Sequence, residues 1–362
     1  MEKIVLYIVS IFFIIGVLDY ILGDRFKLGR YFEEGINNMG PLALSMVGIL
    51  SVTPIISELI LKYIVPITNK IAIDSSIVAS SFIAIDMGAF KIAENISSTQ
   101  EMIYFSGVLI ASILGCTISF TLPLALGMIK EKHLPILCKG ILCGIVTIPV
   151  GLFIGGLMLR IDFKILLINL MPIILLSILV SVGLYIALDK VIRIFTYIGK
   201  VIITIGFIGL GLQGFTSISG IVVIKNLLPI GEALTTVGKI AIFLGGAYVM
   251  LEIVKRLLGK QLELVKEKIG INSSSIAALI GSLASAIIVF STFEDLDDRG
   301  KVICSAFSVA GAYVLGGQLG YVATEAKEIV LIYIATKLIC GVLAIMLAFL
   351  ITKKNSIVIK ES

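Results

Sequence analysis

Residues 75–92 read SSIVASSFIAIDMGAFKI, an apolar segment that is rich in serine and alanine and carries one carboxylate, Asp86. A second segment of this kind, SSSIAALIGSLASAIIVFS, covers residues 273–291. Helices that face lipid are rich in leucine and isoleucine, whereas small and hydroxyl residues mark close backbone packing or the lining of a cavity. We therefore expect both segments to lie inside a helical membrane protein, as broken or re-entrant elements.

Long apolar runs surround these two segments. The chain has 362 residues, of which 58% are hydrophobic and 15% charged, whereas about a quarter of the residues of a soluble domain are charged. A spanning helix needs about 20 apolar residues. The sequence therefore predicts an all-α, polytopic integral membrane protein with about nine to eleven transmembrane helices and no separate soluble domain. The long runs are Ile4 to Leu22, Met39 to Leu61, Met102 to Ile129, Pro135 to Leu159, Phe163 to Leu188, Val191 to Leu212, Gly231 to Val254, Val302 to Ala323 and Glu328 to Thr352.

Two matching stretches indicate an internal repeat. EGINNMG at Glu34 to Gly40 resembles EALTTVG at Glu232 to Gly238, and the same separation relates residues 73–76 to residues 271–274. If both serine-rich segments enter and leave on one side, the excess of lysine and arginine falls on the cytoplasmic side. The two repeats then have inverted topology, as in many secondary transporters. The predicted division is a first membrane repeat (1–160), a linking transmembrane helix (161–190), a second membrane repeat (191–352) and a short C-terminal tail (353–362).

Asp86 is the strongest candidate for a functional residue. An ionisable group inside the bilayer costs about 2.5–3.5 kcal/mol, so one that persists faces a cavity or a partner. Gly88 allows a break in the helix beside it, and a carboxylate suits a cation. The structural alternative is a pair with Lys91 or another lysine, such as Lys239 or Lys337, which lie well inside their apolar runs.

Other polar residues of the apolar segments complete a predicted pathway. Thr117 and Ser119 follow the Gly115-Cys116 break, and Glu34 and Glu232 occupy matching positions before a helix of each repeat. For the two glutamates the alternative is a helix N-terminal carboxylate favoured by the dipole, and for the hydroxyls it is helix packing. The predicted substrate-binding residues are Asp86, Ser81, Met87, Gly88, Thr117, Ser119, Ser282, Ser285, Gln318, Glu34 and Glu232.

The sequence contains few residues that could form a metal site, a nucleotide site or a catalytic site. His133 is the only histidine, and the five cysteines lie in apolar stretches without metal-ligand spacing. No glycine fingerprint for a nucleotide is present with its flanking strand. The net charge of +5 comes from loop residues that report membrane orientation rather than nucleic-acid binding. We expect no metal, no cofactor and no enzyme activity, with a membrane-embedded enzyme as a remote alternative.

Motifs spread along nearly the whole chain resemble one family. They are Tyr31-Phe32-Glu33-Glu34-Gly35, Asp86-Met87-Gly88, Phe105-Ser106-Gly107 with Thr121-Leu122-Pro123, Lys139-Gly140 with Thr147-Ile148-Pro149, and Asp298-Arg299-Gly300-Lys301-Val302. This pattern resembles the ethanolamine permease family, EutH. The resemblance implies a multi-pass protein of the bacterial cytoplasmic membrane that lets ethanolamine enter the cell.

Ethanolamine is a small cation with one hydroxyl, so a carboxylate combined with hydroxyl or amide groups suits it. With only one convincing intramembrane carboxylate, we expect facilitated diffusion through a polar pathway between the two repeats. The alternative is ion-coupled transport of a related small amine or polyol, and a homo-oligomer is left open. The chain departs from the family pattern at three places: Ile85, Ser285 and Gly317-Gln318 stand where asparagine, asparagine and an Asp-His pair are expected.

Overall fold

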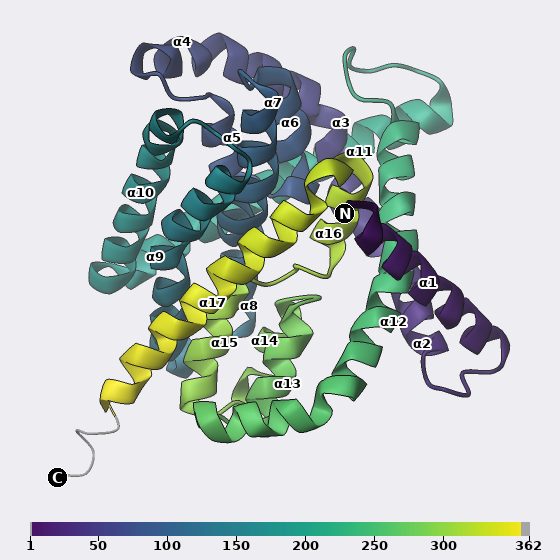
Figure 1. Cartoon of the computed structure of the whole chain (residues 1–362). Helices are drawn as coiled ribbons and strands as arrows, with labels where there is room; N and C mark the ends of the chain where they lie inside the picture. Colours follow the sequence, from purple (N-terminus) through teal and green to yellow (C-terminus); the bar gives the residue numbers. More distant parts are fainter. Residues whose placement is uncertain (1, 356–362) are drawn as a thin grey trace.

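The computed structural model describes residues 2–355, apart from the side chains of residues 2–4, 45, 69, 126–127, 188–189, 192, 195, 258–269 and 353–355. All regular elements in this range are helical (Figure 1). Seven helical stretches are long and apolar enough to cross a membrane, which makes this a polytopic membrane protein. The stretches are Met46–Thr68, Gln100–Ala125, Glu131–Met158, Phe163–Ile186, Thr196–Ser219, Ile230–Leu257 and Lys327–Thr352.

The two other predicted spans differ from these seven. The apolar part of α1 (Glu2–Ile21) covers only Val5–Ile21. Asp19, near its end, accepts hydrogen bonds from the backbone N–H groups of Phe26 and Leu28, which fix the turn into α2 (Gly29–Asn37). The run from Val302 to Ala323, expected as one helix, is divided into α15 (Asp298–Ala310) and α16 (Gly317–Glu325).

The first serine-rich segment is a hairpin of short helices. It contains α5 (Ser76–Phe82), an extended break at residues 83–84, the single turn η2 (Ile85–Met87) and α6 (Ala89–Ile96). Its two ends are joined because Asp74 accepts hydrogen bonds from the backbone N–H and the hydroxyl of Ser98, at 2.8 and 2.6 Å. The chain therefore returns to the level at which it entered.

The second serine-rich segment is also a hairpin, formed by α13 (Ser273–Ser282), a break and α14 (Ile287–Ser291). Asp297 joins its ends by accepting hydrogen bonds from the Asn272 N–H at 2.8 Å and the Ser275 hydroxyl at 2.7 Å. The break also explains why α15 and α16 are separate helices. The N–H groups of Tyr313 and Leu315, between α15 and α16, donate to the carbonyls of Ser282 and Leu283 at the break.

The two hairpins lie toward opposite ends of the molecule. In Figure 1, α5 and α6 are in the upper half and α13 and α14 in the lower half. Beside the first hairpin lies a long helical stretch composed of α7 (Gln100–Tyr104), the π-helical segments η3 (Phe105–Gly115) and η4 (Thr117–Thr121), and α8 (Leu122–Met128). Unusual π winding is often found at functional sites.

The long helices pack around the hairpins. α9 (Leu134–Met158) contacts α15, α17 (Val330–Asn355) and α10 (Phe163–Ile186), and α3 (Met39–Tyr63) contacts α11 (Leu188–Ser219). Close packing in these pairs relies on glycines: a Cβ on Gly48 of α3 would lie 1.8 Å from the Gly206 carbonyl oxygen of α11. The connecting turns are α4 (Val65–Thr68), η1 (Asn69–Ile71), η5 (Glu131–His133), η6 (Phe293–Asp295) and η7 (Lys327–Ile329).

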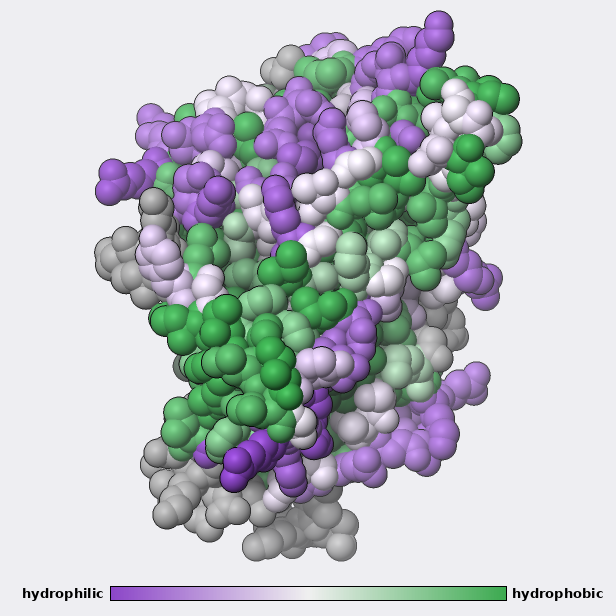
Figure 2. All heavy atoms as spheres, turned by 90° about the vertical axis from the view of Figure 1, so that its right-hand side faces the viewer, coloured by the Kyte–Doolittle hydropathy of each residue, from purple (hydrophilic) through white to green (hydrophobic). Residues whose placement is uncertain are grey.

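α12 (Ile230–Ile269) is a single helix of 40 residues. The polar residues after Glu252 belong to the same helix, which runs beyond the apolar part Ile230–Leu257 to Ile269. Figure 2 shows hydrophobic residues across the middle of one face and hydrophilic residues toward its upper and lower ends, as the solvation of a membrane protein requires. At the C-terminus α17 reaches Asn355, so residues 356–362 of the expected tail lie outside the described part of the chain.

Candidate functional site

A pocket of about 260 Å³ lies where the breaks of the two hairpins approach each other. Asp86 and Met87 from the first hairpin, Ser285 from the second, and Gln318 from α16 line it together. Four of the predicted substrate-binding residues are therefore brought to one place from three distant parts of the sequence. The structure adds Asn38, Cys116, Tyr248 and Tyr313 to the lining.

Asp86 is held at the pocket by the shape of the hairpin. The single turn of η2 follows an extended break, and Gly88 after it has a positive φ of 97°. The Asp86 carboxylate is half-buried and lines the pocket. In the described part of the chain, no other side chain is hydrogen-bonded to it or forms an ion pair with it. A carboxylate in this position is free to accept hydrogen bonds from a cation.

Lys91, the structural partner considered for Asp86, forms other ion pairs. Its ammonium lies 2.8 Å from a Glu325 carboxylate oxygen and 3.0 Å from a Glu94 carboxylate oxygen. Burial opposes the charge of Lys91, but the hydrogen bonds to Glu325 and Glu94 outweigh it and raise the pKa above its usual value. Among the described residues no lysine forms an ion pair with Asp86; Lys337 of α17 reaches the pocket lining through its hydrogen bond to Gln318.

Lys337 belongs to the site although the sequence assigned it no partner. It is only 2% exposed, and its ammonium donates to the side-chain oxygen of Gln318 at 2.5 Å and to the Ser112 carbonyl at 3.0 Å. The rings of Tyr313 and Tyr333 lie 5.8 and 5.7 Å from it. The sequence shows only a lysine deep inside an apolar run. Its partner, Gln318, lies in a separate helix, α16, and the sequence does not show that the two helices pack together.

Most predicted hydroxyl residues are committed to their own helices. The hydroxyls of Ser81, Ser119 and Ser282 each donate to a backbone carbonyl three or four residues earlier. Thr117 does the same and also donates to the Val309 carbonyl of α15 at 3.0 Å. None of these four residues lines the pocket, whereas Ser285 does, with its hydroxyl oxygen accepting from the Ile287 N–H at 3.3 Å.

Glu34 and Glu232 line two further pockets on either side of the central one. Glu34, Tyr31 and Glu252 line a pocket of about 310 Å³, which we call the Glu34 pocket. Glu232, Lys91 and Glu325 line one of about 320 Å³, the Glu232 pocket. Glu232 and Glu252 are 20 residues apart on α12, or about 30 Å along a helix, which is close to the hydrocarbon thickness of a bilayer.

The Glu34 pocket adjoins the Asp86 pocket, because both are lined by Asn38, Tyr248, Ala284, Ser285 and Ile287. The Glu232 pocket shares no lining residue with the Asp86 pocket. One turn of α16 separates Gln318 from Tyr321, which is fully buried and packs edge-on against Phe90 at 6.1 Å. The Asp86 pocket therefore lies next to the Glu34 pocket and apart from the Glu232 pocket.

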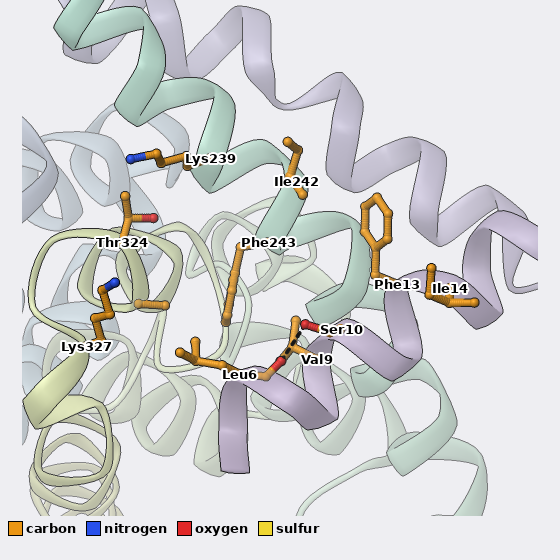
Figure 3. Close-up of a pocket in the computed structure, with 11 residues that line it drawn as sticks. Leu6, Val9, Ser10, Phe13, Ile14, Lys239, Ile242, Phe243, Thr324 and Lys327 are labelled. Carbon is orange, nitrogen blue, oxygen red and sulfur yellow. Dashed lines mark hydrogen bonds between the residues drawn. The ribbon is translucent and has the colours of Figure 1, made fainter. Parts of the chain in front are cut away.

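A larger pocket of about 420 Å³ lies between α1, α12 and α16 (Figure 3). Apolar side chains such as Leu6, Phe13 and Phe243 line most of it, and Lys239 and Lys327 lie at one end. No carboxylate is among the described residues that line it, so the two ammonium groups would repel a cationic substrate without compensation. None of the predicted substrate-binding residues lines this pocket. The Asp86 pocket is therefore the better candidate for an amine.

No group of histidine, cysteine or acidic side chains that could hold a metal ion is found among the described residues. The five cysteines are free and buried.

Comparison with known proteins identifies the family. The family model described as "Ethanolamine utilisation protein, EutH" matches residues 1–351. A probable ethanolamine permease EutH from Listeria monocytogenes is 37% identical over 95% of this chain and 92% of the relative. The uncharacterized protein YxeR of Bacillus subtilis is 36% identical over 97% of this chain and 95% of its own length.

A probable ethanolamine permease EutH from Salmonella typhimurium is 31% identical over 98% of this chain and 96% of the relative. No solved structure matches the chain. The bacterial permeases among these relatives imply the cytoplasmic membrane, and a permease family implies a transporter rather than an enzyme. This multi-pass membrane protein belongs to the EutH ethanolamine utilisation family.

Proposed function

We propose that this protein is an ethanolamine permease that acts by facilitated diffusion, with the Asp86 pocket as its substrate site. The observation that carries the proposal is the half-buried Asp86 carboxylate, without a side-chain partner in the described residues, in a pocket at the centre of a membrane protein. The names of the Listeria and Salmonella relatives support ethanolamine as the substrate.

The route that we propose follows α12. Its residues line the Glu232 pocket at Thr235 and Thr236, the Asp86 pocket at Leu244 and Tyr248, and the Glu34 pocket at Leu251 and Glu252. A substrate ammonium passes between the Glu34 end and the Glu232 end by way of Asp86, once the contact between Phe90 and Tyr321 opens. In this proposal Glu34 and Glu232, which the inverted-repeat interpretation matches, lie at the two ends of the route.

Uptake of labelled ethanolamine into proteoliposomes tests the proposal. We expect saturable uptake that reaches the outside concentration and is unchanged by an imposed sodium or proton gradient. Asp86→Asn removes the charge that holds the ammonium. A hydrogen bond to a charged group is worth about 1.5–3 kcal/mol, so the affinity should fall by about 10- to 100-fold.

Glu131→Gln is the matched control, because Glu131 is an exposed carboxylate in η5 that lines none of these three pockets. If an imposed ion gradient drives the inside concentration of ethanolamine above the outside concentration, transport is ion-coupled and not facilitated diffusion. Saturable uptake of another small amine or polyol, with none of ethanolamine, would favour the alternative substrate class. If the Asp86→Asn variant takes up ethanolamine as the wild type does, Asp86 does not bind the substrate.

A further inference from the structure

The ammonium of Lys337 is the second charge at the centre of this protein. No acidic side chain in the described residues is within ion-pair distance of it, and its hydrogen-bond acceptors are the side chain of Gln318 and the carbonyl of Ser112. A buried charge is expensive unless hydrogen bonds satisfy it. A methionine would fill a similar volume without this cost, so the charge of Lys337 has its effect on the side chains around it.

The hydrogen bond from Lys337 fixes which end of the Gln318 amide faces the pocket. An ammonium has three donors and no acceptor, so only the amide oxygen of Gln318 can face it. The amide NH₂ must then lie on the other side. There the Gln318 side chain lies beside Cys116, and both residues line the Asp86 pocket. Gln318 therefore presents a hydrogen-bond donor to the pocket and no acceptor.

The pocket thus contains two groups of opposite hydrogen-bonding character. Asp86, when ionised, only accepts, whereas the fixed Gln318 amide only donates. A ligand that satisfies both groups carries an ammonium at one end and an oxygen acceptor at the other. A second ammonium would meet the amide N–H groups and the nearby Lys337 charge, and would be repelled.

We propose that Lys337 is a positioning residue that orients Gln318 so that its NH₂ group binds the hydroxyl oxygen of an amino alcohol. This inference rests on the proposed function and deepens it, since it specifies what the pocket selects beyond the ammonium. By this arrangement the protein prefers amino alcohols to alkylamines and excludes diamines. Lys337 acts through Gln318 and does not contact the substrate.

The test compares three unlabelled competitors of ethanolamine uptake in proteoliposomes. Ethanolamine is the reference, propylamine replaces its hydroxyl by a methyl group, and 1,3-diaminopropane carries a second ammonium. One neutral hydrogen bond predicts a preference for ethanolamine over propylamine of roughly 3- to 10-fold. We expect Lys337→Met to bring this ratio close to one, while binding through Asp86 persists.

Lys139→Met is the matched control. Lys139 also lies in a membrane helix, α9, but among the described residues the hydrogen bond to the Gln318 side chain comes from Lys337 and not from Lys139, so the ratio should stay as in the wild type. A Lys337→Met variant that weakens the binding of ethanolamine and propylamine equally would overturn the inference, because a merely structural lysine acts on both amines alike. An absence of saturable ethanolamine uptake by the wild type would instead reject the proposed function.

A double-mutant cycle tests whether Lys337 acts through Gln318. Gln318→Met should lower the ethanolamine preference as Lys337→Met does, and the double variant should lower it no further. Additive losses would overturn the inference.

Gln318→Glu decides the question if Lys337→Met does not fold. Its carboxylate bonds Lys337 with one oxygen and presents an acceptor to the pocket, so 1,3-diaminopropane should become an effective competitor. Continued exclusion of the diamine by this folded variant would contradict the inference.

Discussion

Gly88 determines where the Asp86 carboxylate lies. Its φ of 97° turns the chain from η2 into α6, and the position of its absent Cβ would lie 2.5 Å from the Cγ2 methyl of Thr53 in α3. Both observations exclude a side chain at this position. The left-handed conformation alone costs a non-glycine residue about 1–2 kcal/mol.

We expect Gly88→Ala to lower the thermal stability of the detergent-solubilised protein and to reduce ethanolamine uptake. The added methyl group combines backbone strain with the contact to Thr53, so the free energy of unfolding should fall by about 2 kcal/mol or more. Thermal unfolding followed by size-exclusion chromatography measures this change.

Two further variants separate the causes. Adding Thr53→Ser to Gly88→Ala removes the contacting methyl group and should restore only part of the stability, because the φ strain remains. Gly211→Ala is the control: Gly211 lies inside α11 with open space around its Cβ position, where alanine favours a helix. A Gly88→Ala protein as stable as the wild type would contradict this account.

At the scale of the elements, each serine-rich hairpin is closed at its base by one aspartate. Asp74 bonds Ser98 across the first hairpin and also accepts from the Ser76 N–H at 3.0 Å. Asp297 bonds Asn272 and Ser275 across the second and also caps α15 through the Gly300 N–H. The two carboxylates have the same task in hairpins that lie toward opposite ends of the molecule.

We predict that Asp74→Asn loosens the first hairpin and leaves the second intact. An asparagine keeps one acceptor oxygen but turns an NH₂ group toward backbone and hydroxyl donors, which should cost about 1–3 kcal/mol. Hydrogen–deuterium exchange should show faster exchange in residues 74–98 and unchanged exchange in residues 272–297. Asp297→Asn should give the reverse pattern, and a loss spread over both hairpins in either variant would disprove independent closure.

The sequence predicts some of these elements better than others. Serine, alanine and glycine mark both hairpins because small side chains are needed where chain segments approach closely. Asp86 stands out as a charge in an apolar segment. The break between α15 and α16 was missed because it depends on backbone hydrogen bonds from Tyr313 and Leu315 to the second hairpin, and such long-range pairing leaves no local pattern.

The hydroxyl residues show a second limit. Ser81, Thr117, Ser119 and Ser282 have the composition of a polar pathway, but their hydroxyls bond carbonyls of their own helices. The sequence shows that a hydroxyl is present, but it does not show which acceptor that hydroxyl bonds. The pairing of Lys337 with Gln318 was likewise out of reach, because it depends on how α17 packs beside α16.

At the scale of the whole molecule, the route proposed along α12 is closed between the Asp86 pocket and the Glu232 pocket. The ion pairs of Lys91 with Glu325 and Glu94 lie at the closed end, next to the contact between Phe90 and Tyr321. Because the pKa of Lys91 is raised, its charge contributes at neutral pH and is lost only as the pH rises through that raised value. At neutral pH the closed end of the proposed route therefore opens by a conformational change that separates these ion pairs, and not by deprotonation of Lys91.

A cysteine in place of Ser285, which is half-buried and lines the Asp86 pocket, can report this asymmetry. In a Ser285→Cys variant that lacks the native cysteines, a small membrane-impermeant thiol reagent should label residue 285 from the side of Glu34 and hardly at all from the side of Glu232. Glu325→Gln weakens the closing ion pair and should allow labelling from both sides. Mass spectrometry of the intact protein measures the labelled fraction.

The combined exchange Lys91→Glu with Glu325→Lys keeps an ion pair of reversed direction and should restore one-sided labelling. Glu328→Gln is the control, since Glu328 is an exposed residue just after α16 that lines none of the three pockets. Equal labelling of the otherwise unchanged Ser285→Cys protein from both sides would show that the route is not closed at the Glu232 end.

The closure of both hairpins at their bases also bears on how the protein is made in the cell. At the second break the carbonyls of Ser282 and Leu283 accept hydrogen bonds from the N–H groups of Tyr313 and Leu315, which lie after α15, and unpaired backbone groups are not tolerated in lipid. The second hairpin therefore cannot satisfy its break as an isolated unit during synthesis. We expect the long helices before it to insert first, and the second hairpin to fold between them only when α15 and the residues after it have left the ribosome.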